Sequence, residues 1–238
     1  EPGRRAQQKS YIWLRVTESE TPVVLMHYSP SRAASVATPL LEGFSGYLQT
    51  DGYAGYNQAA ARPDVTQLGC WAHARRKFDA ALKSSSPAAA HVAWEGLVLI
   101  RKLYEIDNRA KNKPPDQRHQ HRQQQVSPHL DRIQAWINDH SAFGLTHGGL
   151  LTTAFTYIQN QWDKLVRFLE DPRLRLDNNL AERHVRPVAM GRRAWLFCRS
   201  QDGAKASAGW YSLVETAKAN GIEPYWYLRH IFEQIPLC

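Results

Sequence analysis

The feature that most constrains the fold of this chain is a long stretch of helical periodicity between two strand-rich pieces. Within it, apolar residues recur at steps of three and four along two runs: Ala93, Leu97, Ile100 and Tyr104, then Phe155, Ile158, Trp162, Leu165 and Leu169. Such steps place apolar side chains on one face of an α-helix. Residues 87–170 are therefore predicted to form an all-α unit. The polar, Gln-rich segment 111–125 is predicted to be a linker or an exposed turn inside it.

Strands are predicted before this stretch. Residues 11–17 and 22–29 are rich in β-branched and aromatic residues and are separated by a polar connection, which indicates two strands that can form a hairpin. A helix is predicted over residues 32–42 and a short strand over 47–50. Residues 65–71 are predicted to form a further strand, followed by a helix through Leu82. This order of elements indicates an α/β piece.

Asp51 follows the short strand predicted over residues 47–50. An acidic residue at the carboxyl end of a strand lies where α/β sheets build their active sites. The dipeptide Asp51-Gly52 is equally typical of a plain turn. The position therefore marks Asp51 as a candidate without deciding its role.

A second acidic candidate, Glu182, lies after the helical stretch. Asp177-Asn178-Asn179 is a helix N-cap signal, and the helix is predicted to run from Leu180 toward Arg186, where Pro187 weakens or bends it. Glu182 and Arg186 are also spaced as an ordinary surface ion pair. Residues 194–198 are predicted to form a strand, and two helices over 204–220 and 225–234 close the chain.

The charge of the chain points to a polyanionic partner. The formal net charge is +8, and a surplus of this kind most often accompanies nucleic-acid binding. A basic soluble protein without such a partner would show the same balance. Three widely spaced cysteines do not make a disulfide framework, and no apolar run approaches the ~20 residues of a bilayer crossing. The chain is expected to be soluble and cytoplasmic, with no membrane partner.

Arginines gather in two places that are predicted to contact DNA. The first group, which is interleaved with Trp195 and Phe197, consists of Arg183, Arg186, Arg192 and Arg193. The second group follows the strand predicted at 65–71 and consists of Arg75 and Arg76. Arginine binds phosphate bidentately, and aromatic rings stack on exposed bases. A solvated basic face, with the aromatic residues in the sheet core, is the alternative. Cys70 and His73 have the spacing of metal ligands, but a structural zinc needs four ligands and no second pair follows.

Four longer segments narrow the function. They read DGYAGYN from Asp51, GCWAHARRKF from Gly69, DNNLAERHVRPVAMGRRAWLF from Asp177 and SLVETAKANGIEPYWYL from Ser212. In this order and spacing the chain resembles the transposases of the insertion sequence 66 family, members of the Asp-Asp-Glu superfamily. The resemblance covers nearly the whole chain.

The resemblance implies an α/β fold with an RNase H-like mixed sheet core, an all-α insertion and a helical C-terminal segment. Residues 1–84 would then be the first part of the core without its first strand, and 85–172 the insertion. Residues 173–205 would be the second part of the core with the helix of the catalytic Glu, and 206–238 the C-terminal segment. The sequence agrees with an insertion, because Asp51 and Glu182 are further apart than the roughly 30–50 residues of a strand-helix unit.

The resemblance also implies a catalytic site. Asp51 matches the family's second Asp and Glu182 its Glu, which makes both catalytic residues and metal ligands. The complete enzyme would hold two Mg²⁺ or Mn²⁺ ions that stabilise the attacking and leaving oxygens at phosphorus. The family's first Asp lies upstream of a segment matching Pro2-Gly3-Arg4, and no Asp precedes Asp51 here. The chain is therefore expected to be a fragment with negligible activity of its own.

The implied function is metal-dependent DNA cleavage and strand transfer in the transposition of a bacterial insertion sequence. Transposon ends and target DNA would be the partners, and a homodimer and companion proteins encoded by the same element are further possibilities. The alternative is a catalytically dead DNA-binding remnant of a transposase. An upstream Asp would separate the two, so at this point the chain's status as an enzyme stays open.

Overall fold

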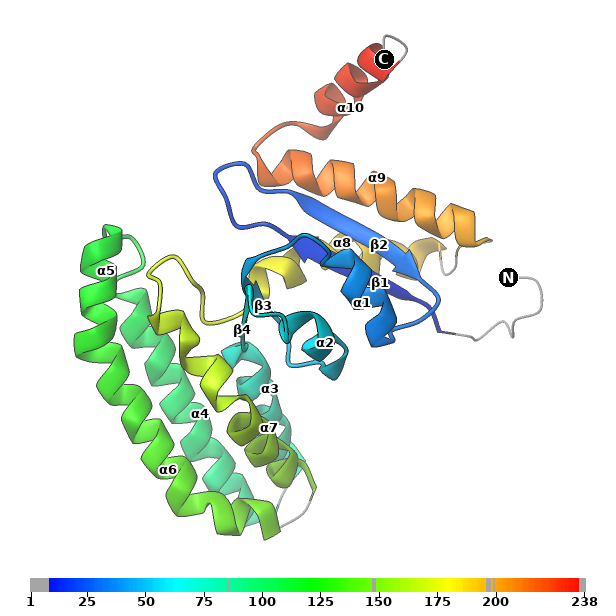
Figure 1. Cartoon of the computed structure of the whole chain (residues 1–238). Coiled ribbons are helices and arrows are strands. Elements are labelled where there is room, and N and C mark those ends of the chain that lie inside the picture. The colour runs from blue at the N-terminus through cyan, green and yellow to red at the C-terminus, as the bar shows by residue number, and fades with distance from the viewer. Residues whose placement is uncertain (1–8, 85, 147–148, 196–197, 199, 236–238) are drawn as a thin grey trace. The chain divides into compact units, whose positions relative to one another are not determined.

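The computed structural model describes residues 9–84, 86–146, 149–195, 198 and 200–235 (Figure 1). The chain divides into two compact units. The first, here called the hairpin unit, is built from residues 1–42 and 179–238, and the second, the helical unit, is Gly43–Asn178. Each unit has a hydrophobic core of its own.

The hairpin unit is organised around two antiparallel strands, β1 (Tyr11–Val16) and β2 (Val24–Ser29), which pair along their whole length. Alternate residues of β2 are buried, namely Val24, Met26 and Tyr28, which is the two-residue period of a strand with one face on a core. The predicted hairpin is confirmed. The predicted helix after it is also confirmed, as the shorter α1 (Ala34–Leu40).

Three longer helices complete the hairpin unit: α8 (Asn179–Trp195), α9 (Gln201–Ala219) and α10 (Pro224–Gln234). The two predicted closing helices are confirmed as α9 and α10. The side chain of Ser200 caps α9 by accepting a hydrogen bond from the Gly203 amide at 3.0 Å. Helix α10 has no buried residue among those described.

Helix α9 binds the backbone of β2 through a stripe of polar side chains. Val24 and Met26 donate their amides to the hydroxyls of Thr216 (3.0 Å) and Ser212 (2.8 Å), and Thr216 donates back to the Val24 carbonyl (3.1 Å). One turn further, Asn220 donates to a carbonyl of the preceding loop. Four residues along a helix rise about 6 Å and two residues along a strand about 6.8 Å. Every fourth residue of α9 can therefore meet every second residue of β2 over this length.

Helix α8 departs from the prediction in two ways. It continues through Pro187 and includes Ala194 and Trp195, where a strand was predicted over residues 194–198. Pro187 removes one backbone hydrogen bond, but the carbonyl that loses its donor belongs to Arg183, an exposed residue that water reaches. A short apolar run fits a helix as well as a strand. Leu196 and Phe197, within the same prediction, lie outside the described residues.

The helical unit contains a parallel pair of strands, β3 (Gly46–Gln49) and β4 (Val65–Leu68). A 3-10 turn (Ala54–Tyr56) and a short helix α2 (Asn57–Ala60) connect them. Both strands were predicted at these positions. The helix after β4, α3 (Trp71–Ser84), begins where the strand was predicted to end, and the fully buried side chain of Trp71 anchors it.

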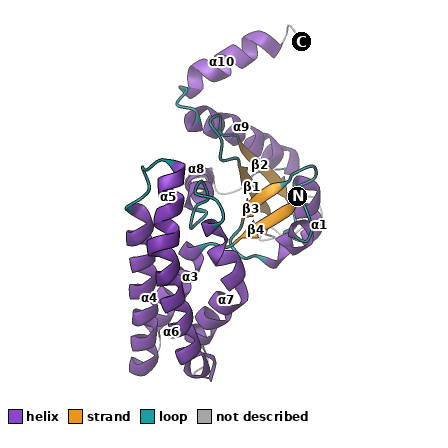
Figure 2. Ribbon diagram, turned by 60° about the vertical axis from the view of Figure 1, so that its left-hand side comes forward, coloured by secondary structure: helices purple, strands orange, loops and turns teal. Residues whose placement is uncertain are grey.

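Four helices of this unit form a bundle, in which α3, α4 (Pro87–Asn108), α6 (Ser127–Thr146) and α7 (Gly149–Val166) each pack on two of the others (Figure 2). Their shared core contains the T-shaped contact of Phe78 with Phe155, whose ring centroids are 5.7 Å apart. The predicted all-α stretch over residues 87–170 is confirmed. Bundle and strand pair belong to one compact unit, in which Arg167, just after α7, donates its guanidinium to the Gln67 carbonyl of β4 at 2.9 Å.

The Gln-rich segment 111–125 is not a linker or exposed turn, as the sequence predicted. Most of it forms helix α5 (Pro115–His121) and a π-helical turn (Arg122–Val126) that continues into α6. The cause is Arg122, whose side chain is fully buried. The polar composition of the segment gave no sign that one of its cations, Arg122, would be buried and hold the segment to the core.

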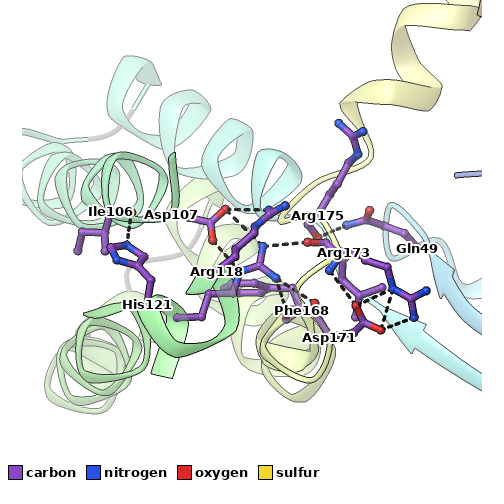
Figure 3. A network of polar contacts seen from close by, with 11 residues as sticks. Gln49, Ile106, Asp107, Arg118, His121, Phe168, Asp171, Arg173 and Arg175 are labelled. Atoms are coloured by element: carbon purple, nitrogen blue, oxygen red, sulfur yellow. Dashed lines mark hydrogen bonds and ion pairs between the residues drawn. The ribbon is translucent and has the colours of Figure 1, made fainter. Parts of the chain in front are cut away.

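Arg122 has an ion-pair partner, an aromatic partner and backbone partners, and Figure 3 shows Asp107, Phe168 and Asp171 among them. It forms a two-pronged ion pair with Asp107 at 2.8 and 3.4 Å, and its guanidinium lies 5.0 Å from the centre of the Phe168 ring. It also donates to three backbone carbonyls in the segment that leaves the bundle, those of Phe168, Asp171 and Leu174, at 2.7–3.0 Å. A buried charge is tolerated only when it is paired and hydrogen-bonded to this extent.

The described residues are mostly helical and hold two separate two-stranded sheets, one antiparallel and one parallel. The predicted mixture of helices and strands is therefore present. The RNase H-like core stays a prediction, as does the four-part division of the chain into domains. None of the described helices combines the length and apolarity needed to cross a bilayer.

Replacing Arg122 by Met is expected to lower the free energy of unfolding by about 3–5 kcal/mol, because it leaves Asp107 and three carbonyls buried without their main donor. Urea unfolding followed by circular dichroism measures this loss. Arg173→Met is the control: Arg173 pairs with Asp171 in the same segment but its side chain is 81% exposed, so the midpoint should not move. A loss below about 1 kcal/mol for Arg122→Met would contradict the central role of this side chain.

Two serines of α9 provide a matched test of the contact with β2. Both donate to the carbonyl four residues earlier, but Ser212 is buried and accepts the Met26 amide, whereas Ser207 is only half-buried. Ser212→Ala should destabilise the protein by about 1–3 kcal/mol, because it leaves a buried amide without an acceptor. Ser207→Ala should change stability little. Equal thermal shifts for the two variants would show that the side-chain contact with β2 does not matter.

Candidate functional site

Asp51 and Glu182, the two predicted catalytic residues, belong to different units. Asp51 lies two residues after β3 in the helical unit, and Glu182 lies in the first turn of α8 in the hairpin unit. Both residues are partly exposed. A site that they share stays a prediction.

Asp51 lies at the carboxyl end of the parallel strands, in a tight turn. Its Oδ1 accepts the amide of Tyr53 at 2.9 Å, and Gly52 between them has a φ of +85°, a conformation that favours glycine. The residue before it is held as well, since Thr50 donates its amide to Leu68 and accepts from a buried glutamine side chain. The turn expected of Asp-Gly is therefore present, at the strand edge where α/β sheets place active sites.

Asp177 and Asn178, which lead to α8, are held near the carboxyl end of β4, the strand that pairs with β3. The Cys70 thiol donates to the Asn178 side chain at 3.0 Å, and Tyr104 donates to the carboxylate of Asp177 at 2.7 Å. Burial raises the pKa of the Cys70 thiol, which keeps it protonated as a donor. Cys70 thus serves to hold the Asp177-Asn178 motif.

His73 lies beside Arg76, whose guanidinium is 3.1 Å from its ring nitrogens. Across the part of the chain that the structure describes, no three His, Cys, Asp or Glu side chains gather as metal ligands would. What fits a divalent ion is the chemistry of Asp51 and Glu182 themselves, which offer the hard carboxylate oxygens that Mg²⁺ and Mn²⁺ bind.

Helix α8 presents a basic face. The four arginines predicted on it (Arg183, Arg186, Arg192 and Arg193) are exposed. Three of them, together with Met190, which is 69% exposed, recur at steps of three and four and so share one side of the helix. The predicted Arg75 and Arg76 are exposed on α3 of the helical unit. The prediction for the side chains of Trp195 and Phe197 falls outside the described residues.

Two further residues were not recognised from the sequence. Glu215 is 5% exposed and lies 3.0 Å from both His184 of α8 and Lys218. It joins α8 to α9. Tyr157 of α7 donates its hydroxyl to the Asp51 carbonyl at 3.2 Å. Neither contact has a local sequence signal, because the partners come from distant parts of the chain.

Comparison with known proteins gives matches along the chain. Residues 1–206 match the Transposase IS66 family, and residues 212–238 match the IS66 C-terminal element. Two uncharacterized proteins of Sinorhizobium fredii, y4qI and y4jD, are 30% and 28% identical over 98% and 99% of this chain. A third, y4hP, is 29% identical over 90% of it.

The alignments cover 45%, 48% and 41% of these relatives, so the chain spans less than half their length. No solved structure matches the chain. Since the family match covers most of the chain and the C-terminal element follows it in order, the chain belongs to the IS66 family of transposases.

Proposed function

We propose that this chain is the catalytic region of a transposase that cuts and joins the DNA of an insertion sequence with the help of divalent metal ions. The observation that carries the proposal is family membership along nearly the whole chain. The position of Asp51, at the carboxyl end of the parallel strand β3, supports it from the structure.

In this proposal Asp51 and Glu182 are metal ligands. One oxygen of Asp51 accepts the Tyr53 amide, which orients the carboxylate before any ion arrives. Glu182 occupies the first turn of α8, which is joined to α9 through His184 and Glu215. Two bound Mg²⁺ or Mn²⁺ ions would supply stabilisation of the attacking and leaving oxygens at phosphorus.

The complete enzyme would need a third carboxylate. No Asp precedes Asp51 in this sequence, and the curated relatives are more than twice as long. We place that carboxylate on a further strand of an RNase H-like core, encoded upstream in the whole protein. This chain by itself is then expected to have negligible activity.

The exposed arginines of α8 are the proposed DNA contacts in the hairpin unit, and Arg75 and Arg76 those in the helical unit. Guanidinium groups bind phosphates bidentately, and the net charge of +8 favours a polyanion. Holding two DNA ends would take two copies of the protein, so a homodimer belongs to the proposal, as do companion proteins of the same element. A catalytically dead remnant that only binds DNA is the second candidate.

DNA binding can be tested on the chain as it stands. Replacing Arg183, Arg186 and Arg193 together by Ala should weaken binding to duplex DNA and lower the slope of log affinity against log salt by about 2–3, because each phosphate contact contributes roughly 0.9. Fluorescence anisotropy over a salt series measures both. The control is Arg101→Ala with Lys102→Ala, exposed cations of α4 that pair with Glu105. An equal loss in the control would mean that the face of α8 has no special role.

Catalysis can be tested in the full-length protein with a transposon-end DNA and Mg²⁺. Asp51→Asn and Glu182→Gln should each reduce strand cleavage on the order of 1,000-fold or more, because each removes a metal ligand. Asp64→Asn is the control, an exposed carboxylate of the helical unit that pairs with Arg62. Absence of cleavage by the unmodified protein, with DNA binding retained, would favour the remnant.

A further inference from the structure

The turn that carries Asp51 is held by a helix of the bundle. Tyr157, on α7, donates its hydroxyl to the Asp51 carbonyl at 3.2 Å, and the same hydroxyl lies 3.5 Å from the Cys70 carbonyl. These carbonyls follow β3 and β4 respectively. One side chain of α7 therefore spans the carboxyl ends of both parallel strands.

Gly52 shows how closely α7 approaches the turn. A Cβ atom at this position would lie 3.0 Å from Cε2 of the Tyr157 ring and 3.4 Å from Cδ of Gln161, one helical turn further along α7. The φ of +85° independently disfavours any other residue. Glycine thus serves two purposes here, and the turn is fitted against this face of α7.

The surroundings of Tyr157 keep its hydroxyl a donor. Both groups that its hydroxyl faces are backbone carbonyls, which can only accept, so the hydroxyl serves as the donor. The ammonium of Lys77 lies 5.0 Å from the centre of the ring and adds a cation–π contact. Both the hydroxyl and the ring are therefore fixed.

We infer that Tyr157 is a positioning residue for Asp51: its hydroxyl fixes the backbone from which the carboxylate projects, so that the helical bundle forms part of the site. The inference rests on the proposed role of Asp51 as a metal ligand. Residues that orient a ligand from behind typically contribute 10–100-fold in metal affinity. Tyr157 acts through the backbone of the ligand and is not itself proposed to touch metal or DNA.

Tyr157→Phe removes the hydroxyl alone, and Tyr47→Phe is the matched control. Tyr47 lies near the start of β3 and donates to Glu170 at 3.0 Å, so it also loses one hydroxyl hydrogen bond in the same unit. In hydrogen–deuterium exchange of the intact chain, Tyr157→Phe should speed exchange of residues 50–54 about 5- to 10-fold, the equivalent of a lost hydrogen bond. Exchange in α4 should be unchanged. Unchanged exchange at 50–54 would overturn the inference.

Mn²⁺ binding to the same chain, followed by electron paramagnetic resonance of the free ion, gives the second readout. Asp51→Asn identifies the affinity that depends on this carboxylate. Tyr157→Phe should weaken that affinity by about 10-fold and Tyr47→Phe should leave it unchanged. Equal affinities for Tyr157→Phe and the unmodified chain would reduce Tyr157 to a structural residue and overturn the inference. Mn²⁺ binding that Asp51→Asn does not weaken would instead overturn the proposed metal role of Asp51.

Discussion

The buried guanidinium of Arg122 is the interaction on which the rest of the helical unit depends. A fully desolvated cation has few acceptable arrangements, and here Asp107 and three backbone carbonyls supply one. Those carbonyls belong to the segment that leaves the bundle. A buried ion pair contributes little net stability compared with apolar packing, so its main effect here is to define one path for the chain.

Further hydrogen bonds hold the residues that follow Leu174, one after another. The side chain of Gln49, at the end of β3, donates to the Arg175 carbonyl (Figure 3), and the Trp71 amide donates to Leu176. Tyr104 and Cys70 then hold Asp177 and Asn178. A series of hydrogen bonds that begins with Arg122 thus holds the family motif at residue 177 near the carboxyl end of β4.

Local sequence signals were sufficient to predict most regular elements of the fold. The hairpin follows from strands rich in β-branched and aromatic residues, and the helical stretch follows from steps of three and four, which are properties of neighbouring residues. The errors arose where distant partners decide: the buried side chain of Arg122 holds a largely exposed polar segment in a helical path against the core. The apolar run at 194–198 was ambiguous, and its described beginning is helical.

In the candidate site too, residues with a local sequence signal were predicted, and residues whose partners are distant in the chain were not. Asp51 was predicted from its place after a strand, and Glu182 from a helix signal and the resemblance. Tyr157 escaped because it lies among the apolar positions of an amphipathic helix, and its hydroxyl contacts a residue 106 positions away. The role of Glu215 has no local signal, because the residue that it joins to α9, His184, lies 31 positions away on α8.

The polar stripe of α9 has a consequence for how the hairpin sheet can grow. Strand edges with free amides and carbonyls recruit other strands, and proteins protect such edges to avoid aggregation. Along β2, both backbone groups of Val24 and the amide of Met26 are already bonded to hydroxyls of α9. Helix α9 therefore blocks the pairing of a further strand at these residues. A strand that joins this sheet, from the remainder of a longer protein or from another molecule, is expected to pair along β1 instead.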